Sequence, residues 1–151
     1  MRVLATLFAA TALASQAAFA DSRLAAPPHA KYQEECGSCH VAYQPGLLPA
    51  TSWQRTMIGL ASHFGTDASV DAATAAAIGR YLQDNAATGK RAVAGGTGLR
   101  ISEALWFVRE HRQVDAATWK STAVKSVANC TACHAGAAGG DYSERAVRIP
   151  R

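Results

Sequence analysis

The chain has 151 residues, of which 49% are hydrophobic and 17% charged, and its formal net charge is +4. This length suits one compact domain or two small lobes. The small basic surplus gives no case for a nucleic-acid-binding protein. After residue 20, no run of about 18 apolar residues occurs, so the sequence predicts no membrane-spanning helix there.

Residues 1–20 have the features of a secretory signal peptide. A short positive start at Met1-Arg2 precedes a mostly apolar stretch over 3–13, and Ala18-Phe19-Ala20 is a small-x-small cleavage site. The apolar run is too short to span a membrane. We therefore expect cleavage after Ala20 and a soluble, exported mature protein.

The first part of the mature chain predicts three helices and no strand. A short helix over 30–39 follows the Pro27-Pro28 pair, which ends any earlier structure. A second helix over 51–64 begins with the capping box Thr51-Ser52-Trp53-Gln54 and ends at a glycine. Its apolar face consists of Trp53, Met57, Leu60 and Phe64. A third helix starts near Ser69 or Asp71 and runs to about Asn85.

The glycine-rich stretch 86–99 is predicted to connect two halves. Beyond it, Ser102 can cap a helix over 105–112, and Asp115 can cap another that contains Trp119. A segment over 126–134 follows, and the tail from 142 onward is expected to be irregular. The predicted fold is all-α, with a first half over 21–88 and a second half over 89–151.

All four cysteines lie in two copies of one pentapeptide, Cys36-Gly37-Ser38-Cys39-His40 and Cys130-Thr131-Ala132-Cys133-His134. This spacing is typical of covalent attachment of a c-type haem. The two thiols can form thioethers with the vinyl groups on one porphyrin edge, and the following histidine can bind the iron as proximal ligand. A zinc site would not need a histidine after each pair, and a redox dithiol would not occur twice with the same trailing histidine.

The sequence therefore predicts a dihaem cytochrome c with iron ligands His40 and His134. Bacteria attach haem covalently outside the cytoplasmic membrane, which agrees with the signal peptide and places the protein in the periplasm. The basic surplus then either balances haem propionates or belongs to an ordinary solvated surface of mixed charge. Because so short a chain buries a modest core by itself, we expect the chain without haem to be largely unfolded.

The sixth ligand of each iron decides what the protein can do. Three further histidines are candidates, with Met57 as the other possibility. His63 and His111 are preferred because each is predicted near the end of a helix that can face a haem. If they are not iron ligands, His63 is interpreted as a cation at a helix C-terminus and His111 as a surface histidine. His29 lies in a segment expected to be loose, and Met57 suits an apolar core position.

The spacing of the histidines supports this pairing. His63 follows His40 by 23 residues, and His111 precedes His134 by 23 residues. Each half then holds one motif and one distal histidine, although a crossed arrangement, with His63 serving the second haem, stays open.

Several segments resemble the bacterial dihaem cytochrome c family over most of the mature chain. In the first half these are Tyr32-Gln33-Glu34-Glu35 ahead of the first motif, Gly46-Leu47-Leu48-Pro49-Ala50, Trp53 and His63-Phe64-Gly65. In the second half they are Arg109-Glu110-His111, Asn129 with the second motif, Tyr142-Ser143-Glu144-Arg145 and Arg148-Ile149-Pro150.

The resemblance implies a small, mostly helical periplasmic protein with two low-spin haems, each bound by two histidines. It implies an electron carrier and not an enzyme, expected as a monomer, with an oxygen-binding monohaem cytochrome c as acceptor and a membrane cytochrome b as donor. The alternatives are a haem enzyme or gas-binding cytochrome with one displaceable distal ligand for peroxide, oxygen or nitric oxide, and a sensor or structural subunit.

Two groups of charged residues are candidates for supporting roles. Glu34, Glu35 and Glu110 could accept a proton from a ligand histidine, although solvated carboxylates are the plainer interpretation. Arg145, Arg148 and Arg151 could pair with propionates or meet a partner protein.

Overall fold

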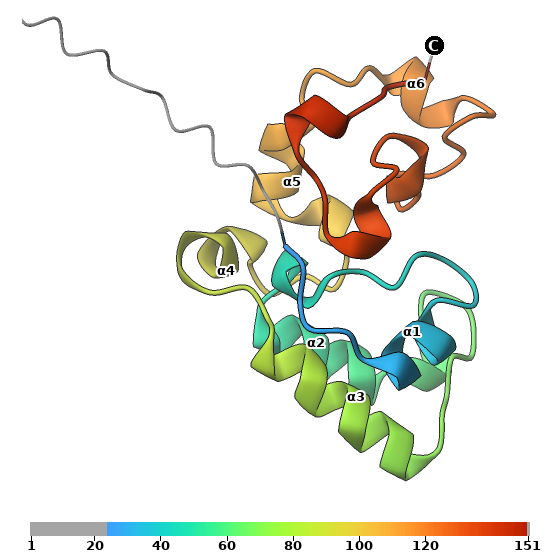
Figure 1. The fold of residues 1–151 in the computed structure, drawn as a ribbon, viewed down its shortest axis with the longest axis vertical. Coiled ribbons are helices and arrows are strands. Elements are labelled where there is room, and N and C mark those ends of the chain that lie inside the picture. Colours follow the sequence, from blue (N-terminus) through green and yellow to red (C-terminus); the bar gives the residue numbers. More distant parts are fainter. Residues whose placement is uncertain (1–23, 151) are drawn as a thin grey trace, which may run out of the picture.

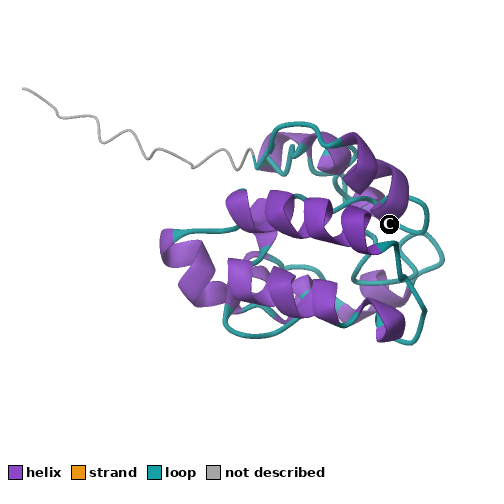
Figure 2. Ribbon diagram, turned by 90° about the horizontal axis from the view of Figure 1, so that it is seen from below, coloured by secondary structure: helices purple, strands orange, loops and turns teal. Residues whose placement is uncertain are grey.

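The computed structural model describes residues 24–150 as short helices joined by loops and 3-10 turns (Figures 1 and 2). The α-helices are α1 (Ala30–Cys36), α2 (Ala50–Ile58), α3 (Ala72–Asp84), α4 (Gly89–Gly95), α5 (Leu105–Glu110) and α6 (Ala116–Lys120). The 3-10 helices are η1 (Pro45–Leu47), η2 (Leu60–Ser62), η3 (Ile101–Glu103), η4 (Cys130–Ala132), η5 (Ala137–Gly139) and η6 (Glu144–Ala146). Residues 24–150 form isolated β-bridges but no strand, so the predicted all-α fold is confirmed. The predicted signal peptide over 1–20 lies outside the described residues.

Two of the predicted helix starts are confirmed by their caps. The carboxylate of Asp71 accepts hydrogen bonds from the amides of Ala73 and Thr74, each at 3.0 Å, and begins α3. The carboxylate of Asp115 accepts one from the amide of Thr118 at 2.7 Å and begins α6. Each cap satisfies amides that the first helical turn leaves without a partner.

The helix predicted over 51–64 is shorter than expected. Pro49 is its N-cap, so Thr51 lies inside the helix and the predicted capping box is wrong. The helix stops at Ile58 because Gly59, a poor helix former, ends it with bonds from its amide to the carbonyls of Arg55 and Thr56. The turn η2 follows, and His63 lies beyond it and not in a helical turn.

The predictions around α4 and α5 also need correction. The glycine-rich connection contains the helix α4, which packs against α5. Gly95 at its end is buried, and a Cβ there would lie 2.8 Å from Cδ of Pro49, so only glycine allows this approach. Ser102 lies within η3 and is not the cap of α5, whose N-cap is Ala104.

Two hydrophobic clusters hold the helices together. The first is formed by Tyr32, Leu48, Trp53, Ile78 and Leu82, between α1, α2 and α3. The second is formed by Leu47, Ala104, Trp106 and Phe107. Tyr43 and Ile101 pack against both clusters, so the packing is continuous between the two halves of the chain.

The first described residues form a strap across the molecule (Figure 1). The amide of Leu24 donates to the carbonyl of Gly140 at 2.9 Å, and the amide of Ala26 donates to Oε1 of Gln44 at 3.0 Å. The side-chain amide of Gln44 in turn donates to the carbonyl of Ala138 at 2.8 Å. This strap, residues 24–26, joins the beginning and the end of the described chain. No helix within residues 24–150 is long and apolar enough to cross a membrane.

Candidate haem sites

The N-terminal site is formed by the first pentapeptide and the segment after η2. The last residue of α1 is Cys36, which is partly buried, whereas Cys39 and His40 are exposed. The ring of His63 faces the ring of His40, with 6.3 Å between ring centres and 28° between ring planes. The chain therefore brings one predicted distal histidine to the motif of its own half.

Neighbouring groups fix the orientation of both rings in the N-terminal site. Nδ1 of His40 lies 2.8 Å from the carbonyl oxygen of Val41, and the ring stacks on Tyr43 at 4.5 Å. The ring of Phe64 meets the ring of His63 edge-on at 4.8 Å. Burial, with help from His40 and Arg100, lowers the pKa of His63 and favours the neutral imidazole that binds metals.

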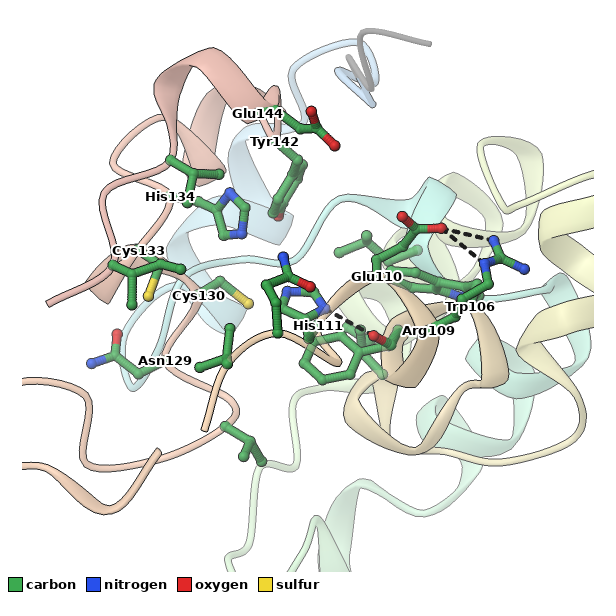
Figure 3. Close-up of a pocket in the computed structure, with 18 of the residues that line it drawn as sticks. Trp106, Arg109, Glu110, His111, Asn129, Cys130, Cys133, His134, Tyr142 and Glu144 are labelled. Atoms are coloured by element: carbon green, nitrogen blue, oxygen red, sulfur yellow. Dashed lines mark hydrogen bonds and ion pairs between the residues drawn. The ribbon is translucent and has the colours of Figure 1, made fainter. Parts of the chain in front are cut away.

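The C-terminal site is formed by the second pentapeptide and the end of α5. The turn η4 carries Cys130, and Cys133 and His134 follow it, all three partly buried. His111 is the C-cap of α5, and its ring centre lies 6.1 Å from that of His134 with 73° between the planes. Figure 3 shows both rings in this pocket beside the sulfur of Cys130.

Phe107 holds the ring of His111. Nδ1 of His111 lies 2.9 Å from the carbonyl oxygen of Phe107, one helical turn earlier. The two rings also stack, with 3.9 Å between their centres and 18° between their planes. The histidine therefore has little freedom to rotate.

Both histidine pairs have the spacing that a shared iron needs. A metal binds an imidazole nitrogen at about 2.0 Å, and that nitrogen lies about 1.1 Å from the ring centre. Two imidazoles on opposite sides of one metal ion should then have centres about 6.2 Å apart. The observed separations of 6.3 Å and 6.1 Å match this value.

The pocket of the C-terminal site also suits the rest of a haem. Its volume is about 690 Å³, and Cys130, Cys133 and both histidines line it. Two buried donors that line the same pocket, the indole nitrogen of Trp106 and the hydroxyl of Tyr142, have no hydrogen-bond partner among the described residues. Such donors are what the carboxylate groups of a haem require.

One thiol in each motif is less acidic than an ordinary thiol. Burial raises the pKa of Cys36 and of Cys130 to about 11. A reactive thiol has a lowered pKa, because the thiolate is the nucleophile. No disulfide joins the four cysteines, all of which lie in the described part of the chain.

The other candidate ligands are engaged elsewhere. Nδ1 of His29 accepts a hydrogen bond from the amide of Tyr32 at 3.1 Å and caps α1. Met57 packs against the first hydrophobic cluster. In the structure the ring of His63 lies beside that of His40, and the ring of His111 lies beside that of His134.

The carboxylates suggested as partners of the ligand histidines form surface ion pairs instead. Glu34 and Glu35 lie 3.0 Å and 3.7 Å from the ammonium group of Lys31. Glu110 pairs with Arg109 at 2.8 Å. The three arginines suggested as partners of the haem propionates have different positions. The side chain of Arg148 donates to the carbonyls of Arg145 and Val147. Arg145 lines the C-terminal pocket, and Arg151 lies outside the described residues.

One side chain connects the two sites. Tyr43 stacks on His40, and its hydroxyl donates at 2.7 Å to the carbonyl of Ala128, two residues before Cys130. Tyr43 therefore contacts a predicted iron ligand of the N-terminal site and the segment that presents the second motif.

Residues 32–142 match the model of the family described as Dihaem cytochrome c. The chain belongs to the dihaem cytochrome c family. The likeness to the crystal structure of the diheme cytochrome c from Shewanella baltica has a TM-score of 0.72 at 36% identity, covering 83% of this chain and 95% of that one. Two structures of the diheme cytochrome c from Rhodobacter sphaeroides each have a TM-score of 0.68. The first is 42% identical, and the match covers 77% of this chain and 98% of that one. The second is 40% identical, and the match covers 76% of this chain and 96% of that one. No curated protein matches the chain.

Membership of this family confirms the resemblance inferred from the motifs, and it identifies an electron-transfer haem protein with two haem groups. For a dihaem cytochrome c, sequence reasoning missed several functional contacts. His40 and His111 donate to the backbone carbonyls of Val41 and Phe107, which no sequence motif reveals. The sequence gives little indication that Trp106 and Tyr142 are hydrogen-bond donors in a pocket, because an indole or phenol is often buried for its apolar surface alone.

Proposed function

We propose that this dihaem cytochrome c is a periplasmic electron carrier with two covalently attached haem groups. Thioethers would form at Cys36, Cys39, Cys130 and Cys133. The axial ligands would be His40 with His63 and His111 with His134. The observation that carries the proposal is the pair of facing histidines in each site, at a separation that suits one iron between them.

The protein side chains determine what each site can do. A haem iron supplies a one-electron couple between its ferric and ferrous states. Histidines held on both sides of the iron would leave substrate no place to coordinate. The Nδ1–H groups of His40 and His111 donate to backbone carbonyls, which leaves Nε2 of each ring free to face the metal.

The C-terminal pocket offers groups for the haem carboxylates. The indole N–H of Trp106 and the hydroxyl of Tyr142 would donate to them. The guanidinium of Arg91 lies over the ring of Trp106 at 4.7 Å and adds positive charge close to that donor. This half of the chain, 89–151, is proposed as the second haem-binding half, and 21–88 as the first.

The N-terminal site is the more accessible to a redox partner. Cys39 and His40 are exposed, so a partner could approach this edge closely enough for outer-sphere electron transfer. The family resemblance supports an oxygen-binding monohaem cytochrome c as acceptor and a membrane cytochrome b as donor, although a fold does not fix its partners. Export through residues 1–20, as predicted, would place the carrier in the periplasm.

Optical spectroscopy of the protein with both haems attached tests the proposal. Two six-coordinate low-spin sites should give low-spin bands in both oxidation states, unchanged by carbon monoxide or cyanide. A high-spin band, or rapid binding of either ligand, would contradict the carrier and favour the haem enzyme or gas-binding cytochrome.

A further inference from the structure

The two histidine pairs differ in the angle between their rings. In the N-terminal site the planes of His40 and His63 are 28° apart, close to parallel. In the C-terminal site the planes of His111 and His134 are 73° apart, close to perpendicular (Figure 3). The separations between ring centres are nearly equal, so the angle distinguishes the two pairs and the distance does not.

This angle has an electronic consequence for a shared iron. An imidazole donates π electron density perpendicular to its own ring, into one of two iron d orbitals. Two parallel rings donate into the same orbital, which separates the two orbitals in energy and stabilises the ferric ion. Two perpendicular rings divide the donation between both orbitals, so the orbitals stay close in energy. Axial ligands are one of the means by which a protein sets a haem potential, and the near-parallel pair gives the lower one.

Neighbouring side chains fix each angle. His40 is held between the carbonyl of Val41 and the ring of Tyr43. His111 is held by the carbonyl and the ring of Phe107, whose ring lies 3.9 Å away. Within residues 24–150, the partner rings are held by aromatic contacts alone: Phe64 meets His63 at 4.8 Å, and Tyr142 lies 5.3 Å from His134. The different angles therefore follow from the packing around all four rings.

Burial acts in the same direction as the ring angle. The ferric state carries one more positive charge than the ferrous state, and burial disfavours the more charged state. In the N-terminal site Cys39 and His40 are exposed and Cys36 and His63 are partly buried, whereas all four corresponding residues of the C-terminal site are partly buried. Burial should therefore raise the potential of the C-terminal site more.

Fixed charges do not reverse this order. Three arginines and two glutamates line the C-terminal pocket: Arg91, Arg109, Glu110, Glu144 and Arg145. They leave one net positive charge, which the carboxylate of Asp141, close enough to act on His134, offsets. The N-terminal site has Arg100 close by, with its guanidinium 4.2 Å from the ring centre of Phe64 beside His63, and the carboxylate of Glu35, close enough to act on Cys36, offsets it. The two sites thus have similar fixed charge, and ring angle and burial decide the difference.

We propose that the C-terminal site is reduced first and the N-terminal site second. The haem held by His111 and His134 would take up the first electron from a one-electron donor, and the haem held by His40 and His63 would take up the second. No proton or bond is exchanged in either step. The inference rests on the proposed function, since it requires two histidines on each iron.

Electron paramagnetic resonance during a redox titration of the full protein with both haems tests the order. The ferric protein should show two low-spin signals, a rhombic one from the near-parallel pair and a strongly anisotropic one from the near-perpendicular pair. The anisotropic signal should disappear at the higher potential. His63→Ala and His111→Ala assign the signals, because each should convert one of them to high-spin.

The outcomes separate the inference from the proposed function. Two low-spin signals of the same shape, or loss of the rhombic signal first, would overturn the order proposed here while leaving the carrier intact. A high-spin signal in the unmodified protein would remove the proposed function itself.

A matched pair of variants on α5 tests what fixes the angle. Phe107→Leu removes the ring that stacks on His111 and should alter the anisotropic signal alone. Val108→Ala, at a neighbouring position that is 57% exposed, should change neither signal. If Phe107→Leu leaves the anisotropic signal unchanged, packing against Phe107 does not set the ring angle. If that variant loses its haem, the redox titration of the unmodified protein still decides the order of reduction.

Discussion

His63 and His111 are presented by different local structures. His63 follows a 3-10 turn, and the next residue, Phe64, has a φ of +50° that turns the chain away. His111 is the C-cap residue of α5 and is held by the carbonyl of Phe107. A residue before a sharp turn and a residue at a helix end thus face their partner histidines at similar distances.

Replacing either histidine should free one iron position. We expect His63→Ala and His111→Ala each to turn one haem high-spin and to leave the other low-spin, as measured by optical and paramagnetic resonance spectra. His29→Ala is the control, because His29 caps α1 and should affect stability without changing either spin state. Two low-spin haems in either ligand variant would contradict the assignment.

At the residue scale, cysteine and histidine types made much of the site predictable. The paired pentapeptides indicate the attachment positions, and counting the remaining histidines left few distal candidates. The roles of Tyr43, Trp106 and Tyr142 could not be predicted, because they depend on contacts between segments far apart in the sequence. His29 was discounted as loose, and only the structure shows it as a cap.

At the scale of elements, α2 and α3 form the framework behind the N-terminal site. Ile78 on α3 is 1% exposed and lies in the first hydrophobic cluster with Trp53 of α2. Helix α2 leads through Gly59 and η2 directly to His63. Packing in this cluster therefore determines where His63 lies.

Truncating Ile78 should weaken this framework. Ile78→Ala should lower the free energy of unfolding by about 2–5 kcal/mol, since it leaves a cavity in a fully buried position. Ile58→Ala, at a residue of α2 that is 80% exposed, should change it by less than about 0.5 kcal/mol. Chemical denaturation of the holoprotein measures both, and equal effects would show that the cluster does not support the fold.

The sequence was informative for elements with strong local signals and misleading elsewhere. Asp71 and Asp115 were recognisable because a carboxylate before a helical stretch caps it through local bonds. The apolar spacing from Trp53 to Phe64 suggested one helix, yet Gly59 interrupts it. Helix α4 was not expected in a glycine-rich stretch, and its packing against α5 outweighs its weak intrinsic propensity.

At the scale of the whole molecule, Tyr43 joins the two sites through a single hydrogen bond. Tyr43→Phe keeps the ring on His40 and removes the hydroxyl that donates to Ala128. We expect a loss of about 1 kcal/mol in the free energy of unfolding, with both haems still low-spin. Tyr81→Phe is the control, as no hydrogen bond from its hydroxyl occurs within residues 24–150. A loss as large in the control would refute a specific role for the bond.

The fold should depend on its haem groups. The described hydrophobic clusters are small. Within residues 24–150, three buried polar atoms around the C-terminal pocket have no hydrogen-bond partner: Trp106 Nε1, His134 Nδ1 and Tyr142 Oη. A variant with all four cysteines changed to alanine, purified without haem, should show a largely unfolded circular dichroism spectrum. A native-like helical spectrum would show that the polypeptide folds unaided.

The strap formed by residues 24–26 has a consequence for the order of folding. Gly140, which receives the amide of Leu24, has a φ of +76°, and a Cβ there would lie 2.5 Å from the backbone nitrogen of Ala25. The chain is synthesised from its N-terminus, so the strap has no partner until the last part of the chain has emerged. Native closure thus comes late and over a long sequence separation, which is slow. During that delay the segment between the strap and Gly140, which holds both pentapeptides, is not yet closed into a loop.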